Sequence, residues 1–163
     1  MVSNFSWVIP DRLAGAAMPG GRLPGSQWAE RETLSDLEDL RERGVRCLVT
    51  LTEAASHFGP YCRQVGLTWY FFPIPEFGIP EDERQLGGLT EKLLAHMEAG
   101  EAVCVHCYAG IGRTGLVLCC LTGRYLGLEA GEAIARVRGI RPALETRDQE
   151  RFVYRCLRRC SSG

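Results

Sequence analysis

The amino-acid sequence predicts an α/β fold, a single domain in which a central, mostly parallel sheet is flanked by helices. Short apolar, β-rich segments alternate with segments of helical periodicity along the chain, a pattern typical of parallel sheets covered on both faces. The length of 163 residues suits one ordinary domain with a substantial core. No internal repeat, low-complexity tract or linker divides the chain. We therefore expect residues 1–163 to form one domain.

The N-terminal region is expected to hold an edge of the sheet, a surface loop and a helix. Residues 7–17 should form the edge region, and prolines and glycines mark residues 18–25 as a surface loop. A helix should follow at about residues 27–43, because leucines recur along one face. Gly44 should end this helix, as glycine does at many helix C-termini.

Two strands are expected in the middle of the chain. The first should span residues 45–51 and the second residues 67–72. The second strand must end before Pro73, since proline donates no hydrogen bond to a neighbouring strand. The loop from there to Pro80 connects regular elements at the surface, where functional residues are common. We expect part of the active site in this loop.

The second half of the chain is predicted to be mostly helical around one more strand. A helix with one apolar stripe should end at Gly100, and residues 102–106 should form a short central strand. The helix after Arg113 is apolar nearly all round, which indicates burial in the middle of the fold. Two shorter helices are expected near residues 130–138 and 146–160.

Composition limits the partners and the location that we expect. A formal net charge of -1 and a pI near 6.3 give no general affinity for nucleic acid. A signal peptide is absent, and so is any apolar run of about 18 residues, so we expect no membrane insertion and a cytoplasmic location, with the nucleus as an alternative. The eight cysteines include adjacent Cys119 and Cys120 in an apolar run, and free buried thiols explain them better than disulfides. We expect a monomer.

One segment stands out as the carrier of chemistry. It reads His106-Cys107-Tyr108-Ala109-Gly110-Ile111-Gly112-Arg113-Thr114-Gly115. A cysteine six positions before an arginine is weak evidence alone, because about one such pair is expected by chance in this composition. Requiring the histidine, the glycines and the hydroxyl residue as well lowers the chance to about one in a million at a given cysteine. The whole segment therefore indicates function.

The residue types of this segment suit the binding of a tetrahedral phosphate. A loop that folds around a dianion must turn its backbone N–H groups inward, and Gly110 and Gly112 permit the backbone angles and close approach that this needs. The helix that begins near Arg113 points its positive dipole end at the same place, which favours a bound anion and the thiolate of Cys107. The planar Arg113 guanidinium can hold two phosphate oxygens. We therefore predict phosphate-ester chemistry through Cys107.

This segment resembles the phosphate loop of the protein tyrosine phosphatase superfamily, and of its small atypical dual-specificity phosphatases in particular. Shorter segments resemble the family in the same order, at residues 4–10, 12–15, 51–53, 74–77 and 141–150. The resemblance implies a cysteine-dependent phosphatase fold without metal or cofactor. It also implies a hydrolase that removes phosphate from phosphotyrosine, and from phosphoserine or phosphothreonine, in a phosphorylated protein or peptide through a phosphocysteine intermediate.

The same resemblance implies roles for individual residues. Cys107 would attack phosphorus, and Arg113 would clamp the phosphate. Thr114 would assist departure of the thiolate as a hydroxyl hydrogen-bond donor, with a plain first-turn helix residue as the alternative. His106 would orient the loop by hydrogen bonds. The phosphate-binding residues would be Tyr108, Ala109, Gly110, Ile111, Gly112 and Arg113.

The general acid is where the sequence departs from the family. Departure of an alkoxide or phenoxide needs a proton, which the family takes from an aspartate on the loop after the fourth strand. Glu76 stands at the matching position, and its extra methylene moves the carboxyl and adds a rotatable bond. Glu81 and Asp82 are alternative acids, but acidic residues after Pro80 also fit the first turn of a helix. A chain without a dedicated acid is the third alternative. We predict Glu76.

The C-terminal segment allows two interpretations of one glutamine. Gln149 matches a family position that helps to place the hydrolytic water, yet residues 146–149 also form a capping box for the last helix. Capping is the better interpretation. Several arginines of that helix are expected to form its solvent-exposed face, and a docking surface for acidic partners is a minor alternative.

Other functions remain as alternatives. A phosphoinositide or RNA 5′-phosphate hydrolase can use the same loop, but Tyr108, Ala109 and Ile111 add no charge for further phosphates. A phosphate-binding module without turnover is favoured only by the glutamate at position 76. A thiol redox enzyme shares a cysteine-headed anion loop but finds no other motif support in the chain. Because no His/Cys/Asp cluster with ligand spacing lies outside the loop, we expect no metal.

Overall fold

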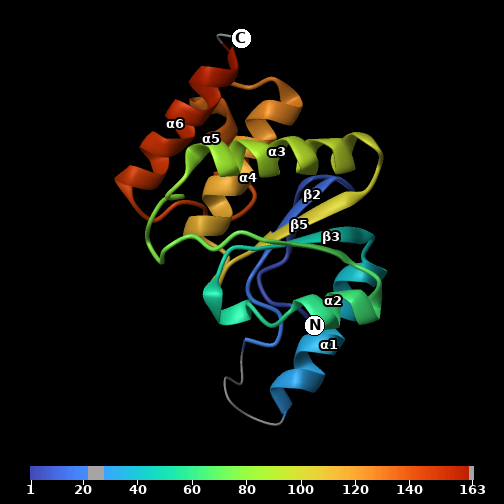
Figure 1. The fold of residues 1–163 in the computed structure, drawn as a ribbon. Coiled ribbons are helices and arrows are strands. Elements are labelled where there is room, and N and C mark those ends of the chain that lie inside the picture. The colour runs from blue at the N-terminus through green and yellow to red at the C-terminus, as the bar shows by residue number, and fades with distance from the viewer. Residues whose placement is uncertain (22–27, 162–163) are drawn as a thin grey trace.

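The computed structural model describes residues 1–21 and 28–161. Its strands are β1 (Ser6–Ile9), β2 (Leu13–Ala16), β3 (Val45–Thr50), β4 (Thr68–Phe71) and β5 (Ala102–His106). They form a five-stranded sheet in the order β1-β2-β5-β3-β4, in which β1 and β2 are antiparallel and all other neighbours are parallel (Figure 1). The predicted α/β fold with a mostly parallel sheet is confirmed.

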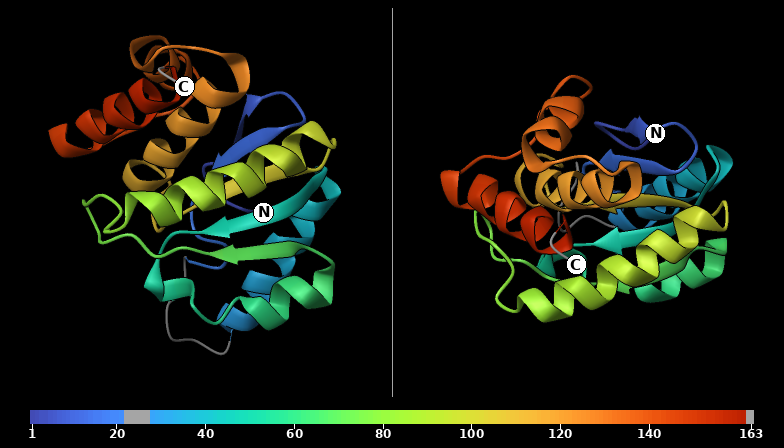
Figure 2. Two further views of the ribbon diagram at one scale, coloured as in Figure 1. Left: turned by 45° about the horizontal axis from the view of Figure 1, so that its top comes forward. Right: turned by 90° about the horizontal axis from the view of Figure 1, so that it is seen from above.

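Helices cover both faces of this sheet. They are α1 (Trp28–Glu42), α2 (Gly59–Val65), α3 (Glu83–Glu98), α4 (Gly112–Leu126), α5 (Ala130–Arg138) and α6 (Arg147–Ser161). A 3-10 turn, Glu53–Ala55, stands between β3 and α2. α1 and α2 lie on one face, and α3 and α4 cover the other with α5 and α6 beyond them (Figures 1 and 2). None of the helices in the described part of the chain is long and apolar enough to cross a membrane.

The central strands send alternate side chains to two hydrophobic clusters, one on each face. In β5, Val103 and Val105 pack with α3 and α4, whereas Cys104 packs with the α1 and α2 side. In β3, Val49 packs on the α3 and α4 side, and Leu48 packs on the α1 and α2 side. Both faces of these strands are therefore buried, as is usual in the middle of a parallel sheet.

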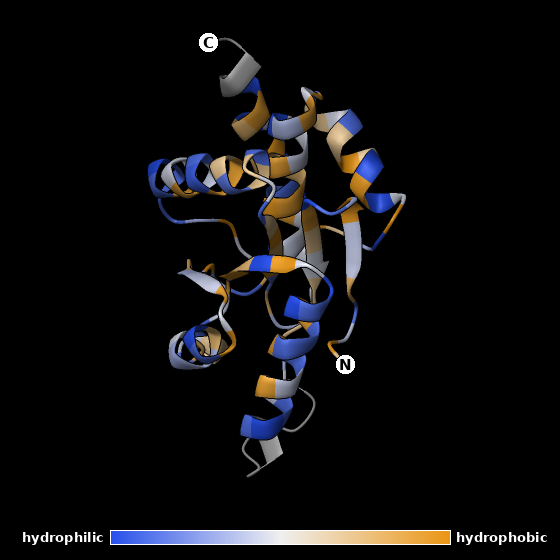
Figure 3. Cartoon of the chain, turned by 90° about the vertical axis from the view of Figure 1, so that its right-hand side faces the viewer, coloured by the Kyte–Doolittle hydropathy of each residue, from blue (hydrophilic) through white to orange (hydrophobic). Residues whose placement is uncertain are grey.

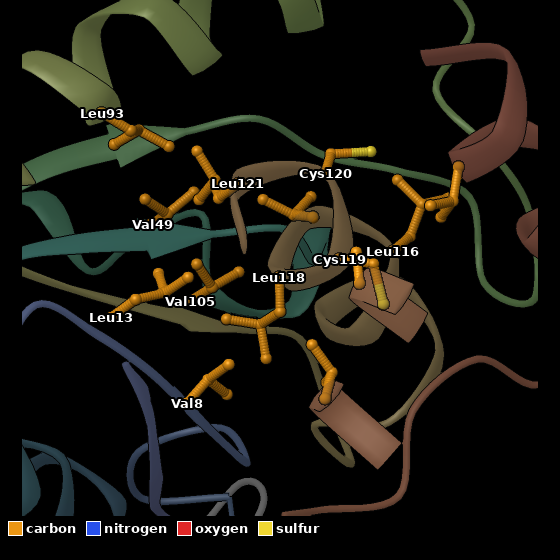
Figure 4. Packing of buried hydrophobic residues seen from close by; sticks show 14 of the residues in the cluster. Val8, Leu13, Val49, Leu93, Val105, Leu116, Leu118, Cys119, Cys120 and Leu121 are labelled. Carbon is orange, nitrogen blue, oxygen red and sulfur yellow. The ribbon is translucent and has the colours of Figure 1, made fainter. Parts of the chain in front are cut away.

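α4 is the central helix of the larger cluster. All its residues from Gly112 to Gly123 are buried, and Figure 4 shows Leu118 and Leu121 beside Val49 and Val105 of the sheet. Truncating such a buried leucine to alanine typically costs about 2 to 5 kcal/mol. The prediction of a buried helix after Arg113 is confirmed, and this packing holds the first turn of α4 rigidly at the end of β5.

α1 is an amphipathic surface helix. It is hydrophilic along most of its length, as Figure 3 shows, while Leu37 and Leu40 are fully buried on its inner side. Gly44 follows the helix with φ 107°, a backbone angle that favours glycine. The predicted glycine stop is therefore confirmed, although the predicted start at residue 27 lies outside the described residues.

The N-terminal prediction is wrong in two respects. β2 is not at an edge, because it pairs with both β1 and β5, so only β1 borders the sheet. Pro19 and Gly20 are buried rather than on a surface loop, since the Gly20 N–H donates to Asp36 Oδ2 of α1 at 2.8 Å. Residues 22–25 of the predicted loop lie outside the described residues.

The later elements match their predictions closely. The strand at residues 102–106 and the helix at 130–138 have the predicted bounds. β3 and β4 each end one residue earlier than predicted, and the last helix begins one residue later. The cysteines of the described residues are free, and all of them except Cys156 are buried, as predicted.

Candidate active site

The predicted phosphate loop joins the end of β5 to the start of α4, at the middle of the sheet. Cys107 is 3% exposed, and its Sγ accepts a hydrogen bond from the Gly110 N–H at 3.3 Å. The first turn of α4 begins with Gly112, so its unpaired N–H groups face the same loop. Strand, loop and helix therefore meet in the order that anion binding requires.

Every carbonyl group from residue 107 to residue 111 accepts a hydrogen bond. The Cys107 carbonyl accepts from His106 Nδ1 at 2.9 Å, and the Tyr108 carbonyl accepts from Met18 N at 3.0 Å. The Ala109 carbonyl accepts from Asn4 Nδ2 at 3.1 Å, and the Gly110 carbonyl accepts from Arg141 NH2 at 2.8 Å. The Ile111 carbonyl accepts from both Gly115 N at 2.9 Å and Leu144 N at 3.1 Å. The C=O of one residue and the N–H of the next point in opposite directions across a trans peptide unit, so carbonyls fixed outward leave the N–H groups to face inward. This geometry is compatible with the predicted anion site.

Glycine is required at two positions of the loop for steric reasons. Gly110 has φ 83°, and a Cβ there would lie 2.5 Å from the carbonyl oxygen of Ala16 at the end of β2. A Cβ on Gly115 would lie 2.7 Å from the backbone nitrogen of Leu144. Any larger residue would push the loop or the first turn of α4 out of place.

His106 is fully buried behind Cys107. Its Nε2 lies 2.7 Å from Thr50 Oγ1, its Nδ1 lies 2.9 Å from the Cys107 carbonyl oxygen, and its ring stacks on Phe58 at 5.6 Å. Burial, with a smaller contribution from the charge of Arg113, lowers the pKa of His106 from 6.5 to about 4. The imidazole is therefore neutral at pH 7, fully buried and held between two partners.

Arg113 connects the phosphate loop to the loop that carries Glu76. Arg113 is 8% exposed, and its guanidinium donates through NH1 to the Ile74 carbonyl oxygen at 3.2 Å. Two residues on, Glu76 and Phe77 form an exposed turn closed by a hydrogen bond from the Gly78 N–H to the Pro75 carbonyl at 2.8 Å. The structure therefore brings the Glu76 loop beside Arg113.

The alternative acid Asp82 has a structural task. It is the N-cap of α3, where its Oδ1 accepts from the backbone N–H groups of Arg84 at 2.9 Å and Gln85 at 3.3 Å. Glu81 is exposed next to it. A structural role at the start of a helix is therefore confirmed for Asp82, which caps α3 rather than lying in its first turn.

Thr114 lies in the first turn of α4 with its side chain fully buried. Among the described residues its Oγ1 has no hydrogen-bond partner. A buried hydroxyl without a partner costs about 1 to 3 kcal/mol, which calls for a reason beyond stability. Such a group, in the helix turn that follows the Cys107 loop, fits a donor that is used during reaction.

Residues 22–125 match the family described as "Polymorphic toxin system, DSP-PTPase phosphatase". The matched span contains both the Glu76 loop and the phosphate loop. The chain belongs to this tyrosine and dual-specificity phosphatase family. It is a hydrolase of the cysteine-dependent class, as are its homologues.

Curated relatives of this phosphatase cover most of its length. It is 28% identical over 165 residues to cyclin-dependent kinase inhibitor 3 of Rattus norvegicus, which covers 93% of this chain and 77% of the relative. It is 26% identical over 153 residues to dual specificity protein phosphatase CDC14C of Symphalangus syndactylus, covering 92% of this chain. The chain spans 30% of that relative and 33% of the CDC14C phosphatase of Homo sapiens.

Solved structures of similar fold span almost the whole phosphatase. Tk-PTP in its active form has a TM-score of 0.80 at 25% identity and covers 98% of this chain and 99% of its own. Kinase-associated phosphatase, with its catalytic-site cysteine changed to serine, has a TM-score of 0.77 at 19% identity and covers 100% of this chain and 98% of its own. The latter likeness shows the shared fold alone.

The phosphatase uses Arg141, which the sequence analysis quoted only as part of a family segment, to support the loop. Arg141 is 3% exposed, and besides the Gly110 carbonyl it donates to Ser6 Oγ at 2.9 Å. Burial lowers its pKa from the ordinary arginine value, and its charge is close enough to interact with Cys107. No local pattern in the sequence marks Arg141 as a support of the loop. Only its contacts in the structure reveal this role.

Gln149, in the first turn of α6, and Glu145, just before that helix, also lie at this site. Gln149 is fully buried and forms the predicted capping box, since its N–H donates to Thr146 Oγ1 at 3.1 Å. Its Nε2 also donates to the Gly78 carbonyl at 3.1 Å, which ties α6 to the Glu76 loop. The Glu145 carboxylate lies so close to Gly112 that a Cβ there would collide with it. Sequence reasoning missed this carboxylate at the phosphate loop.

The described residues offer no group of three or more His, Cys, Asp or Glu side chains placed to hold a metal ion. A hollow of about 660 Å³ lies away from the phosphate loop, between the C-terminal end of α4, the start of α5 and the outer part of α6. None of the predicted site residues lines it.

Proposed function

We propose that this phosphatase hydrolyses phosphotyrosine, and also phosphoserine and phosphothreonine, in proteins or peptides through a phosphocysteine on Cys107. The observation that carries the proposal is the phosphate loop, whose carbonyls are held outward around Cys107 while Arg113 closes one side. The short segments around the loop resemble dual specificity protein phosphatase 23 in particular, and we propose a relationship to that enzyme. Residues 1–163 are proposed to act as one monomeric catalytic domain in the cytoplasm.

The reaction runs in two balanced steps. The Cys107 thiolate attacks phosphorus, the bond from phosphorus to the leaving oxygen breaks, and Glu76 gives its proton to that oxygen. A water molecule then attacks the phosphocysteine, Glu76 takes one of its protons, and the phosphorus–sulfur bond breaks to release inorganic phosphate. Arg113 and the inward N–H groups stabilise the charge on the phosphoryl oxygens in both steps. Thr114 donates a hydrogen bond to the departing thiolate.

Exposed aromatic side chains beside the loop favour an aromatic phosphate ester. Tyr108 is 49% exposed within the phosphate loop, and Phe77 is 58% exposed beside Glu76. Apolar surface of this kind offers contact to the ring of a phosphotyrosine. The loop residues Ala109 and Ile111 bring no cation for a second phosphate, which argues against polyphosphorylated substrates.

A substrate panel with three enzyme forms tests the proposal. Phosphotyrosine, phosphoserine and phosphothreonine peptides and a phosphoinositide are compared for the wild type, Cys107→Ser and Glu76→Gln. We expect the wild type to favour the phosphotyrosine peptide, and Cys107→Ser to lose turnover while still binding vanadate. Glu76→Gln should slow hydrolysis of alkyl phosphates more than that of aryl phosphates with acidic leaving groups. Preference for the phosphoinositide, or full activity of Cys107→Ser, overturns the proposal.

A further inference from the structure

We propose that Trp69, on the outer strand β4, is a positioning residue that holds the backbone of Cys107 through Thr50 and His106. The inference rests on the proposed role of Cys107. It assigns a task to a residue that lies two strands away from the phosphate loop and touches no reacting atom.

A continuous chain of hydrogen bonds runs from Trp69 to the loop. Trp69 Nε1 lies 2.8 Å from Thr50 Oγ1, which lies 2.7 Å from His106 Nε2. His106 Nδ1 lies 2.9 Å from the Cys107 carbonyl oxygen. The residues come from the neighbouring strands β4, β3 and β5, in which Thr50 pairs in register with His106.

The chemistry of the end groups decides the direction of every bond. The indole N–H of Trp69 can only donate, so Thr50 Oγ1 accepts from it. The Cys107 carbonyl can only accept, so Nδ1 of His106 carries the proton. The neutral imidazole then has a bare Nε2, which accepts the single hydroxyl hydrogen of Thr50. The donor at one end of this hydrogen-bond chain and the acceptor at the other therefore require the same direction for every bond, and each bond has one donor and one acceptor.

Trp69 contributes by fixing the rotation of the Thr50 hydroxyl. With the indole N–H on one lone pair, the hydroxyl hydrogen points to His106, and the imidazole is held on both sides. Both Thr50 and His106 are fully buried, so no solvent competes for these bonds. The carbonyl of Cys107 is the first of the outward-held carbonyls, so a loosened imidazole loosens the position of the nucleophile itself.

The Trp69 ring is itself fixed by packing. It stacks on Phe71 at 5.4 Å between ring centroids. A Cβ on Gly59 of α2 would lie 3.1 Å from the ring, so glycine at that position leaves the room that the indole needs. Packing explains the ring, but it does not explain why the N–H is directed at Thr50, since phenylalanine would stack equally well.

Kinetics of single and double variants separate this role from packing. Trp69→Phe keeps a stacked ring and removes only the donor, and we expect kcat for an aryl phosphate to fall about tenfold with KM unchanged, the effect of about one hydrogen bond. Thr50→Ser should retain most activity, whereas Thr50→Val should lose it. The double variant Trp69→Phe with Thr50→Val should be no slower than Thr50→Val alone, because both act through one chain. Phe71→Leu, which removes the stacking partner of Trp69 but keeps the indole donor, serves as the comparison and should lower kcat less than Trp69→Phe does.

The wild type provides a test that needs no variant. In nitrogen NMR spectra of the whole chain, His106 should appear with Nδ1 protonated and Nε2 bare from pH 5 to 8, and Trp69→Phe should shift its resonances. A proton on Nε2, an unchanged kcat in Trp69→Phe, or additive effects in the double variant overturns the inference. If Cys107→Ser remains active, the proposed function fails; if it is inactive while Trp69→Phe is not impaired, only this inference fails.

Discussion

Gly110→Ala is the substitution that most sharply tests how the phosphate loop is built. Gly110 is buried at φ 83°, and the added Cβ would lie 2.5 Å from the carbonyl oxygen of Ala16, a strand-end group with little freedom to move. Gly100 supplies a matched control. It has the same φ of 83°, but no heavy atom lies within 4 Å of a Cβ built on it. The two alanine variants therefore share the backbone strain and differ only in the collision.

The two variants should differ in stability and, above all, in activity. The left-handed backbone costs a non-glycine residue about 1 to 2 kcal/mol, so Gly100→Ala should lose about that much unfolding free energy and keep its activity. Gly110→Ala carries the same strain and must also move the loop or the end of β2, at a further cost of about 1 to 3 kcal/mol. A displacement of about 1 Å at the loop is enough to lower the rate about a hundredfold.

Urea unfolding and turnover of an aryl phosphate measure both effects, and vanadate binding reports the integrity of the loop. We expect Gly110→Ala to lose turnover and vanadate affinity together, while Gly100→Ala loses stability alone. Equal unfolding free energies for the two variants, with wild-type turnover in Gly110→Ala, refute the reasoning. Such a result means that the contact with Ala16 does not shape the loop.

Two further predictions follow from His106 and Thr114. Burial holds the pKa of His106 at about 4, whereas the unfolded chain binds its proton below about 6.5. Between about pH 4 and pH 6.5 the unfolded state therefore binds more protons than the folded state. Protonation of His106 should lower the free energy of unfolding by up to about 3 kcal/mol as the pH falls from 7 to 4. In urea unfolding, the stability advantage of the wild type over His106→Gln should shrink by about that much from pH 7 to pH 4.5, and a constant difference contradicts the assignment. Thr114→Val should slow hydrolysis of the phosphocysteine about tenfold without loss of stability, because its hydroxyl has no partner to lose. Thr122→Val removes the other unpartnered hydroxyl of α4 and should leave turnover unchanged; equal rates for the two variants count against Thr114.

Periodicity and glycine signals in the sequence were enough to predict the sheet and most helices. The strand at residues 102–106 is short and fully apolar up to its histidine, and the helix after Arg113 has no polar face, so burial of both could be predicted without knowing their partners. The edge prediction for residues 7–17 failed at β2. A four-residue strand of small residues shows no sign of which neighbours it will acquire, and here those are β1 and β5.

The supports of the site were harder to predict because they are long-range. Arg141 reaches the Gly110 carbonyl over 31 positions, and Asn4 reaches the Ala109 carbonyl over 105. A side chain that binds a backbone carbonyl carries no local pattern, since every residue has such a carbonyl. The phosphate loop itself could be predicted because its glycines, cysteine and arginine are consecutive. Trp69, on an outer strand, looked like any β-strand aromatic residue.

The central claim is that phosphate passes through Cys107, and acid-quenched mass spectrometry tests it most directly. The enzyme is quenched during turnover of an aryl phosphate, using Glu76→Gln to slow the second step, and its peptides are mapped. We predict one phosphoryl group on the peptide that contains Cys107, absent from Cys107→Ser. Continued turnover with no phosphoryl group on that peptide, or with the group on another residue, contradicts the account.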